Sequence, residues 1–137
     1  MENVDEKWII EKAEEIYFTL DRGLQECVYH KAFEVELKNA GISYESEKII
    51  PIIYKNNQVG YGRADIVLKN IIIEFKAISS LPKLSEMKQI NHYMKFLNIP
   101  KGIIINFGQP SVNQRSTIDY ILIPNPSLNQ DLIFDKS

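Results

Sequence analysis

The sequence predicts a mixed α/β domain in which helices flank a central sheet. Three observations support this class. Apolar residues first recur at helical spacing, short strand-like segments then alternate with turns, and the nearly continuous apolar stretch KGIIINFG follows a third helical segment. The chain has 137 residues, which suits one domain with its own core. We therefore expect a single domain over residues 1–137.

Two helices are expected in the N-terminal part of the chain. In DEKWIIEKAEEIYFTL, apolar residues share one helical face at Trp8, Ile9, Ala13, Ile16 and Leu20. Asp5 suits the N-cap, because its side chain can accept a hydrogen bond from the first turn. The sequence DRG ends this helix, and a second helix is expected over about residues 24–40. It should end at Gly41, since glycine readily adopts the left-handed conformation that closes a helix.

The next part of the chain predicts an antiparallel meander of three strands. KIIPIIY indicates a strand whose Pro51 has no N–H for the ladder, which places it at a sheet edge. KNNQVG supplies a turn and YGRADIVL the second strand, while KN supplies another turn and IIIEFKA the third strand.

A third helix and two further strands complete the expected elements. After ISSLPKL, Ser85 can cap a helix with the sequence EMKQINHYMKFLN, which should stop before Pro100. KGIIINFG predicts a strand buried on both faces, as in a parallel pair covered by helices. TIDYILI predicts a last strand, and we expect the tail after Pro124 to be poorly ordered.

The hairpin RADIVLKNIIIEFKA carries charged residues at regular places. With the turn at KN, Asp65 faces Glu74 and Arg63 faces Lys76. One face is then wholly apolar and holds Ala64, Ile66, Leu68, Ile71, Ile73, Phe75 and Ala77. The other face holds Arg63, Asp65, Val67, Ile72, Glu74 and Lys76. The alternation of side chains along a strand therefore fixes the register.

Asp65 and Glu74 would lie side by side, where like charges are destabilising. Two carboxylates about 5 Å apart repel by roughly 3 kcal/mol at an effective dielectric constant of about 20. A shared divalent cation would offset this repulsion, since carboxylate oxygens suit Mg²⁺ or Mn²⁺, and Lys76 on the same side could activate water or stabilise a phosphate. The alternative is a solvated lattice of weak ion pairs that also includes Arg63. The hairpin alone leaves both interpretations open.

Three stretches together carry a family resemblance. GLQECVY fits Gly-x-x-Glu-x-x-Tyr at Gly23, Glu26 and Tyr29, RADIVLKNIIIEFKA fits an Asp followed by Glu-x-Lys, and QINHYMKFLNIPKGIIINFG fits Gln-x-x-x-Tyr before a buried strand. In this order they resemble the GxxExxY family of the PD-(D/E)xK nuclease superfamily over about residues 5–123. Ala64 stands where the superfamily name has Pro, which removes no reactive group.

The resemblance implies a restriction-endonuclease-like core that hydrolyses phosphodiester bonds with Mg²⁺ or Mn²⁺. The metal ligands it implies are Asp65, Glu74, the backbone carbonyl of Phe75, and Glu26 approaching from its helix. The catalytic residues it implies are Asp65, Glu74, Lys76 and Glu26. The substrate-binding residues expected beside them are Gln89, Tyr93, Arg63, Lys83 and Lys88.

The leading hypothesis is a metal-dependent DNA nuclease, acting as an exonuclease on double-stranded DNA. One alternative is an inactive nuclease-fold module that binds nucleic acid or a protein, and another is an unrelated α+β domain that meets a protein partner. Similar CRISPR-associated RecB-type exonucleases carry four cysteines for an iron–sulfur cluster, and Cys27 alone cannot build one, so no such cluster is expected. A homodimer and a helicase or defence-system partner are compatible with the resemblance.

Composition sets further expectations. The net charge of −2 argues against nucleic-acid binding over the whole surface but allows a local basic patch. A single cysteine, no secretory signal and no long apolar run predict a cytoplasmic protein without a membrane segment. His30 and His92 are expected at the surface, and Tyr29 in packing. The excess of Ile, Asn and Lys over Arg indicates an AT-rich genome, which fits a defence nuclease of a giant virus.

Overall fold

The structure, a computed structural model, describes residues 3–108 and 117–125. Its elements, in chain order, are α1 (Glu6–Leu20), α2 (Glu26–Asn39), β1 (Glu45–Tyr54), β2 (Asn57–Val67), β3 (Ile71–Lys76), α3 (Leu84–Leu97), β4 (Lys101–Asn106) and β5 (Asp119–Pro124). The predicted order of helices and strands is confirmed. The prediction about the tail after Pro124 concerns residues that lie outside the described ranges, apart from Asn125.

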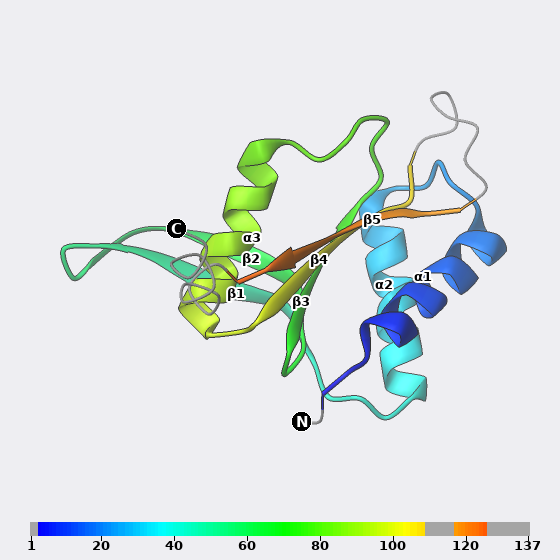
Figure 1. Cartoon of the computed structure of the whole chain (residues 1–137), viewed down its shortest axis with the longest axis horizontal. Helices are drawn as coiled ribbons and strands as arrows, with labels where there is room; N and C mark the ends of the chain where they lie inside the picture. The colour runs from blue at the N-terminus through cyan, green and yellow to red at the C-terminus, as the bar shows by residue number, and fades with distance from the viewer. Residues whose placement is uncertain (1–2, 109–116, 126–137) are drawn as a thin grey trace, which may run out of the picture.

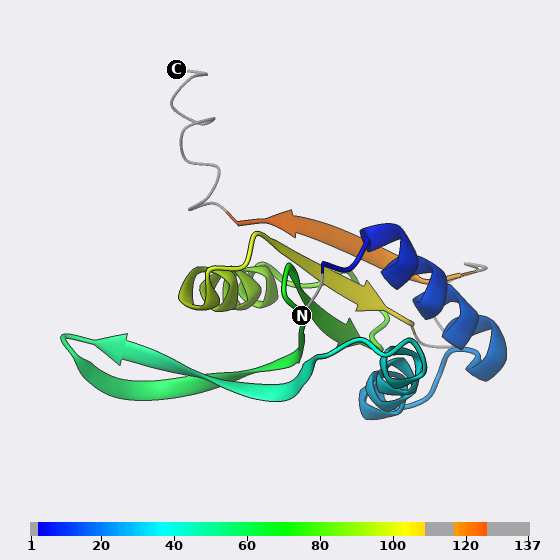
Figure 2. The same ribbon diagram turned by 90° about the horizontal axis from the view of Figure 1, so that it is seen from below.

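The strands form one mixed sheet in the order β1-β2-β3-β4-β5. Strands β1, β2 and β3 make the predicted antiparallel meander, β3 pairs with β4 in parallel, and β5 returns antiparallel to β4. Helices α1 and α2 cover one face of the sheet, while α3 covers the other (Figures 1 and 2). The predicted class, a central mixed sheet flanked by helices, is therefore confirmed.

Local signals in the sequence explain the start of α1 and the end of α2. The N–H of Lys7 donates to Oδ1 of Asp5 at 3.0 Å, so Asp5 caps α1 as predicted. Gly41 follows the end of α2 with a φ of 69°, again as predicted. The start of α3 is different, because Lys83 rather than Ser85 occupies the N-cap and makes no side-chain cap bond. Its carbonyl accepts from the N–H groups of Glu86 and Met87, which begins the helix earlier.

The hairpin of β1 and β2 is longer than the sequence predicted. Its turn consists only of Lys55 and Asn56, both with positive φ (46° and 66°), so the next residues already belong to β2. Two left-handed residues match the twist of a hairpin, and asparagine tolerates this conformation. Strand β1 is an edge strand, as Pro51 predicted. The hairpin reaches well past the helices of the α1–α2 layer (Figure 1).

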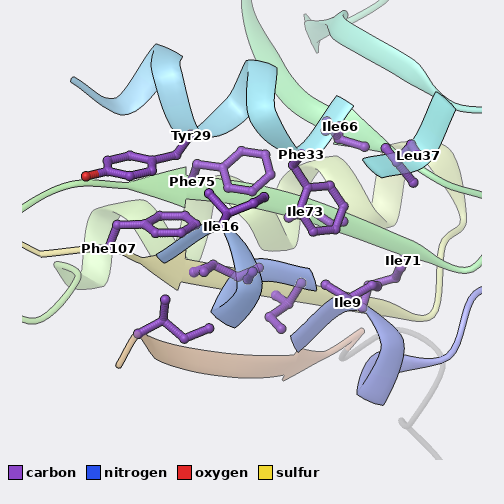
Figure 3. Close-up of a cluster of buried hydrophobic side chains, with 14 of the residues drawn as sticks. Ile9, Ile16, Tyr29, Phe33, Leu37, Ile66, Ile71, Ile73, Phe75 and Phe107 are labelled. Carbon is purple, nitrogen blue, oxygen red and sulfur yellow. The ribbon is translucent and has the colours of Figure 1, made fainter. Parts of the chain in front are cut away.

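Apolar side chains form one core on each face of the sheet. The larger core joins α1 and α2 to the sheet and includes Ile9, Ile16, Phe33, Ile73 and Phe75 (Figure 3). The second core joins α3 to the sheet and includes Ile50, Ile72, Ile90, Met94 and Ile104. Residues of β3 and β4 alternate between the two cores, so these central strands are buried on both faces, as predicted for KGIIINFG.

The predicted apolar face of the β2–β3 hairpin is wrong at Ala64. The paired residues Ile66–Ile73 and Val67–Ile72 confirm the register, but the recorded pairing of β2 with β3 ends there. Ile66 packs in the α1–α2 core, whereas Ala64 packs in the α3 core. The alternation is interrupted at Asp65, because from this residue on side-chain bonds replace the backbone ladder between the strands.

Helix α3 approaches β2 very closely at Gly62. A Cβ placed on Gly62 would lie 2.6 Å from Cε1 of Tyr93, whose ring is buried. A Cβ placed on Gly60 would lie 3.7 Å from its nearest neighbour, an ordinary contact. The absence of a side chain at Gly62 therefore lets Tyr93 reach the backbone of β2.

We expect Gly62→Ala to lower the free energy of unfolding by about 1–3 kcal/mol, the usual cost of overpacking a core. Gly60→Ala, the same change two residues away in the same strand, should alter it by about 0.5 kcal/mol or less. Urea denaturation followed by circular dichroism measures both values. Equal stability of the two variants would contradict the close packing at Gly62.

Candidate active site

Asp65 and Glu74 bond to each other's strand at the point where the ladder between β2 and β3 ends. The N–H of Asp65 donates to Oε2 of Glu74 at 2.6 Å, and the N–H of Phe75 donates to Oδ2 of Asp65 at 2.9 Å. Each carboxylate thus accepts a backbone N–H of the neighbouring strand, in the place where a backbone carbonyl would accept in a regular ladder. The two acidic groups are held side by side, as the hairpin register predicted.

Burial makes this pair of carboxylates electrostatically unfavourable. Glu74 is only 8% exposed, and burial raises its pKa to about 8, with the Asp65 carboxylate adding to the effect. Burial also raises the pKa of Asp65, while the N–H of Phe75, His30 and Lys76 oppose that rise. Ionising both groups at once is therefore unfavourable, because the protein alone does not fully compensate two negative charges here.

Lys76 and Glu26 face the same place. The charge of Lys76 opposes the rise in pKa of Asp65, Glu74 and Glu26, so its ammonium group acts on all three carboxylates. Desolvation is the main cause that raises the pKa of Glu26. The positive charge of Lys76 opposes this rise, and the carboxylates of Asp65 and Glu86 add to it. The four residues predicted to be catalytic thus come together from α2, β2 and β3.

The ion pairs differ from those of a solvated charge lattice. Nζ of Lys76 lies 3.9 Å from Oε2 of Glu86 on α3, and Nη1 of Arg63 lies 3.8 Å from Oε1 of Glu47. Within residues 3–108 and 117–125, Asp65 and Glu74 take part in no ion pair of this kind. The two central carboxyl groups therefore have no cationic side chain as a direct partner among the described residues.

The Gly-x-x-Glu-x-x-Tyr stretch positions Glu26 at the start of α2. Gly23 has a φ of 102°, which glycine adopts without the usual steric cost. The hydroxyl of Tyr29 donates to the carbonyl of Asp21 at 2.6 Å and accepts from the N–H of Leu24 at 3.1 Å, so it fastens the preceding loop. The ring of Tyr29 stacks on Phe107 with centroids 4.1 Å apart (Figure 3), which confirms the predicted packing role.

The sequence did not reveal two residues next to this cluster. His30 was expected at the surface, but it is buried, with Nε2 3.0 Å from Oγ of Ser46 and its ring beside Phe75. Its spacing of four residues from Glu26 places it on the same face of α2, and this was the available signal. Glu86, the partner of Lys76, carries a buried Oε2 with no hydrogen-bond partner among the described residues.

The predicted substrate-binding residues occupy different environments. Tyr93 is buried, its hydroxyl accepts from the N–H of Arg63 at 3.0 Å, and the side chain of Gln89 hydrogen-bonds to it. Lys88 is exposed on α3, and Lys83 is the N-cap residue of that helix. A cavity of about 470 Å³ lies between the β1–β2 hairpin and α3, with Ile52, Tyr61, Glu86, Lys88, Gln89 and Tyr93 among its lining residues.

Two features are not found among the described residues. Within the described ranges, no group of three or more His, Cys, Asp or Glu side chains is arranged to hold a metal ion by itself. Over the same residues, no helix combines the length and the apolar character needed to cross a membrane. A metal at Asp65 and Glu74 would therefore need ligands beyond a ready-made cluster of side chains.

Comparisons with known proteins bear on the family and the fold. A family model described as the PD-(D/E)XK nuclease superfamily matches residues 3–118. The crystal structure of SSO0001 superposes with a TM-score of 0.54 and 23% identity, covering 82% of this chain and 59% of that one. A phage-related exonuclease from Haemophilus somnus 129PT gives a TM-score of 0.50 and 14% identity, covering 94% and 76%. At these identities the likeness concerns the fold, and a search of curated proteins finds no match.

We expect the raised pKa of Glu74 to make the protein less stable as pH rises from about 4.5 to about 8 without divalent ions, because the folded state resists losing this proton. Glu74→Gln keeps an acceptor for the N–H of Asp65 but cannot ionise. Its melting temperature should therefore exceed that of the wild type at pH 8 and match it near pH 4.5.

The matched control is Glu11→Gln, which neutralises an exposed carboxylate on α1. Thermal unfolding followed by circular dichroism in EDTA-treated buffers gives the comparison. A difference between wild type and Glu74→Gln that does not grow with pH would show that Glu74 ionises normally in the folded protein.

Proposed function

The chain belongs to the PD-(D/E)XK nuclease superfamily, and we propose that it is a metal-dependent deoxyribonuclease whose active site consists of Glu26, Asp65, Glu74 and Lys76. The observation that carries this proposal is the pair Asp65 and Glu74, which are bonded to each other's strand, partly or fully buried, and without a cationic partner at hydrogen-bond distance among the described residues. A purely structural site would gain stability from neutralising at least one of these carboxylates.

The donor set fits a hard divalent cation. One oxygen of Asp65 and one of Glu74 accept backbone hydrogen bonds, and Oδ1 and Oε1 are the oxygens assigned to Mg²⁺ or Mn²⁺. We add the backbone carbonyl of Phe75 as a further ligand, and we propose that the carboxylate of Glu26 approaches the ion from α2 once metal is bound, since the three carboxylates form no ready-made cluster. Mg²⁺ commonly binds one or two carboxylates and completes its shell with water and substrate phosphate, so a three-residue cluster is not required.

Lys76 supplies positive charge in this site. Its ammonium group can donate hydrogen bonds to a phosphate oxygen and stabilise the charge that develops there, while Glu86 holds it at the α3 side. Glu26, at the start of α2, adds a third carboxylate to those of Asp65 and Glu74. A bound divalent cation would supply further charge neutralisation and make water more acidic.

Several finer assignments accompany this proposal. We assign the chain to the GxxExxY family. Gly23 and Tyr29 shape and fasten the loop before α2, and Glu26 then faces Asp65 from the start of this helix. We propose that it acts in the cytoplasm as an exonuclease on double-stranded DNA. A homodimer, a helicase or defence-system partner, and a defence role in a giant virus belong to the same proposal and rest on the sequence resemblance alone.

We expect Mn²⁺ to bind the wild-type protein with a measurable enthalpy in isothermal titration calorimetry. Asp65→Ala should lose this signal, because it removes one of the two central carboxylates, and Glu11→Ala should retain it. Circular dichroism checks that both variants are folded. Equal Mn²⁺ binding by Asp65→Ala and wild type would remove Asp65 from the proposed metal site.

We expect the purified protein to degrade DNA with Mg²⁺ or Mn²⁺ and to stop when EDTA is added. Lys76→Ala and Glu74→Ala should each lower the rate by about 100-fold or more, the usual scale for removing an electrostatic or acid–base group. Lys38→Ala, which changes an exposed lysine on α2, is the control.

A time course on linear and circular plasmids with Mn²⁺ separates the modes of cutting. An exonuclease should degrade the linear form and spare the circular form. Activity that persists in both Lys76→Ala and Glu74→Ala would refute the assigned site, and DNA binding without cleavage under either ion would favour the inactive module instead.

A further inference from the structure

We propose that the cavity between the β1–β2 hairpin and α3 holds one unpaired nucleotide of the DNA strand next to the cleavage site. This inference rests on the proposed nuclease function for the identity of the substrate. It adds the form in which the substrate enters, namely as a single strand rather than as an intact duplex.

The cavity borders the proposed active site. Glu86 lines the cavity, and its Oε2 lies 3.9 Å from Nζ of Lys76. Tyr93 also lines it, and the hydroxyl of Tyr93 accepts from the N–H of Arg63, two residues before Asp65 in β2. A strand whose phosphate lies at Lys76 can therefore extend directly into this cavity.

One wall of the cavity is apolar and the other is polar, which suits the apolar face of a base and the charged phosphate of a nucleotide. The hairpin wall contributes Ile52, which is 41% exposed, and the small residue Gly62. The α3 wall contributes the exposed polar residues Lys88 and Gln89. A base can pack against the apolar wall while its phosphate meets the lysine, the combination that single-strand binding grooves use.

Charge favours a nucleic acid as the occupant. Lys88 carries a positive charge that lies outside the described ion pairs, whereas the one acidic residue on the wall, Glu86, already faces Lys76. Lys88 therefore offers a positive charge to a ligand in this cavity, although the whole chain carries a net charge of −2. The negatively charged phosphates of a DNA strand would be attracted to Lys88, whereas an apolar ligand would make no use of this charge.

The size of the cavity limits the occupant to one strand. Its volume of about 470 Å³ is in the range of small-molecule sites, about 300–1,000 Å³, and is bounded on two sides by the hairpin and α3. One base with its sugar and phosphate is of this scale, and a base pair with both backbones is larger. Packing against an apolar wall does not distinguish between bases, so binding should be independent of sequence.

The experiment measures binding without cleavage. A fluorescein-labelled single-stranded oligonucleotide and a blunt duplex of the same length are titrated with protein in EDTA, and fluorescence anisotropy gives the dissociation constants. We expect the wild type to bind the single strand more tightly than the duplex. Duplex binding as tight as single-strand binding would overturn the proposal.

Two matched pairs of variants locate the binding surface. Ile52→Glu places a negative charge in the cavity and should weaken single-strand binding by about 10-fold or more, whereas Ile53→Glu changes the next exposed isoleucine of β1, which is not among the cavity residues. Lys88→Ala should lower the slope of log Kd against log salt concentration by about 1, and Lys95→Ala, further along α3, should not. Equal effects within either pair would place binding elsewhere.

The outcomes separate this inference from the proposed nuclease function. Because the titrations contain EDTA, they do not depend on metal binding or on hydrolysis. A protein that shows the expected differences between variants but never cleaves DNA would keep the cavity as a strand-binding site and refute the nuclease. A protein that cleaves DNA but binds equally well after Ile52→Glu would keep the nuclease and refute the cavity.

Discussion

The site depends on one structural constraint, the end of the backbone ladder between β2 and β3. Beyond Ile66 and Ile73, the carboxylates of Asp65 and Glu74 accept the N–H groups of the opposite strand. These bonds satisfy backbone donors that would otherwise be buried without partners, so the carboxylates cannot turn away without a cost of about 1–3 kcal/mol for each donor. The same bonds keep two negative groups adjacent, and the remainder of the site is organised around them.

The rest of the fold supplies the rigidity that this arrangement needs. Strand β3 is buried on both faces, and Phe75, which follows Glu74, packs between the rings of Phe33 and Phe107. Tyr29 stacks on Phe107 and bonds the loop before α2, which ties the position of Glu26 to the same aromatic cluster (Figure 3). Apolar burial thus offsets the electrostatic cost of gathering carboxylates at one end of the sheet.

The sequence allowed the element order, the hairpin register and the proximity of Asp65, Glu74 and Lys76 to be predicted, because strand alternation is a local property. It failed where tertiary contacts override alternation. Ala64 changes face because side-chain bonds interrupt the ladder at Asp65. His30 was expected at the surface and Glu86 was not singled out, since a helical pattern does not tell which polar positions of α2 and α3 turn toward the sheet. The catalytic, metal-binding and substrate-binding roles assigned to all of the predicted site residues remain proposals.

The raised pKa values bear on how a cation would enter the site. With the pKa of Glu74 near 8, the site without metal holds a proton at neutral pH, and this proton partly relieves the repulsion from Asp65. A divalent cation that binds both carboxylates must displace that proton, so metal affinity and pH are linked. One ammonium group, on Lys76, faces the carboxylates of Glu26, Asp65, Glu74 and Glu86, and cannot balance them alone. A phosphate placed against these carboxylates would add more negative charge, and a bound cation is therefore the simplest way for the phosphate that is cleaved to approach them, whereas the neighbouring nucleotide in the cavity beside α3 lies further from them.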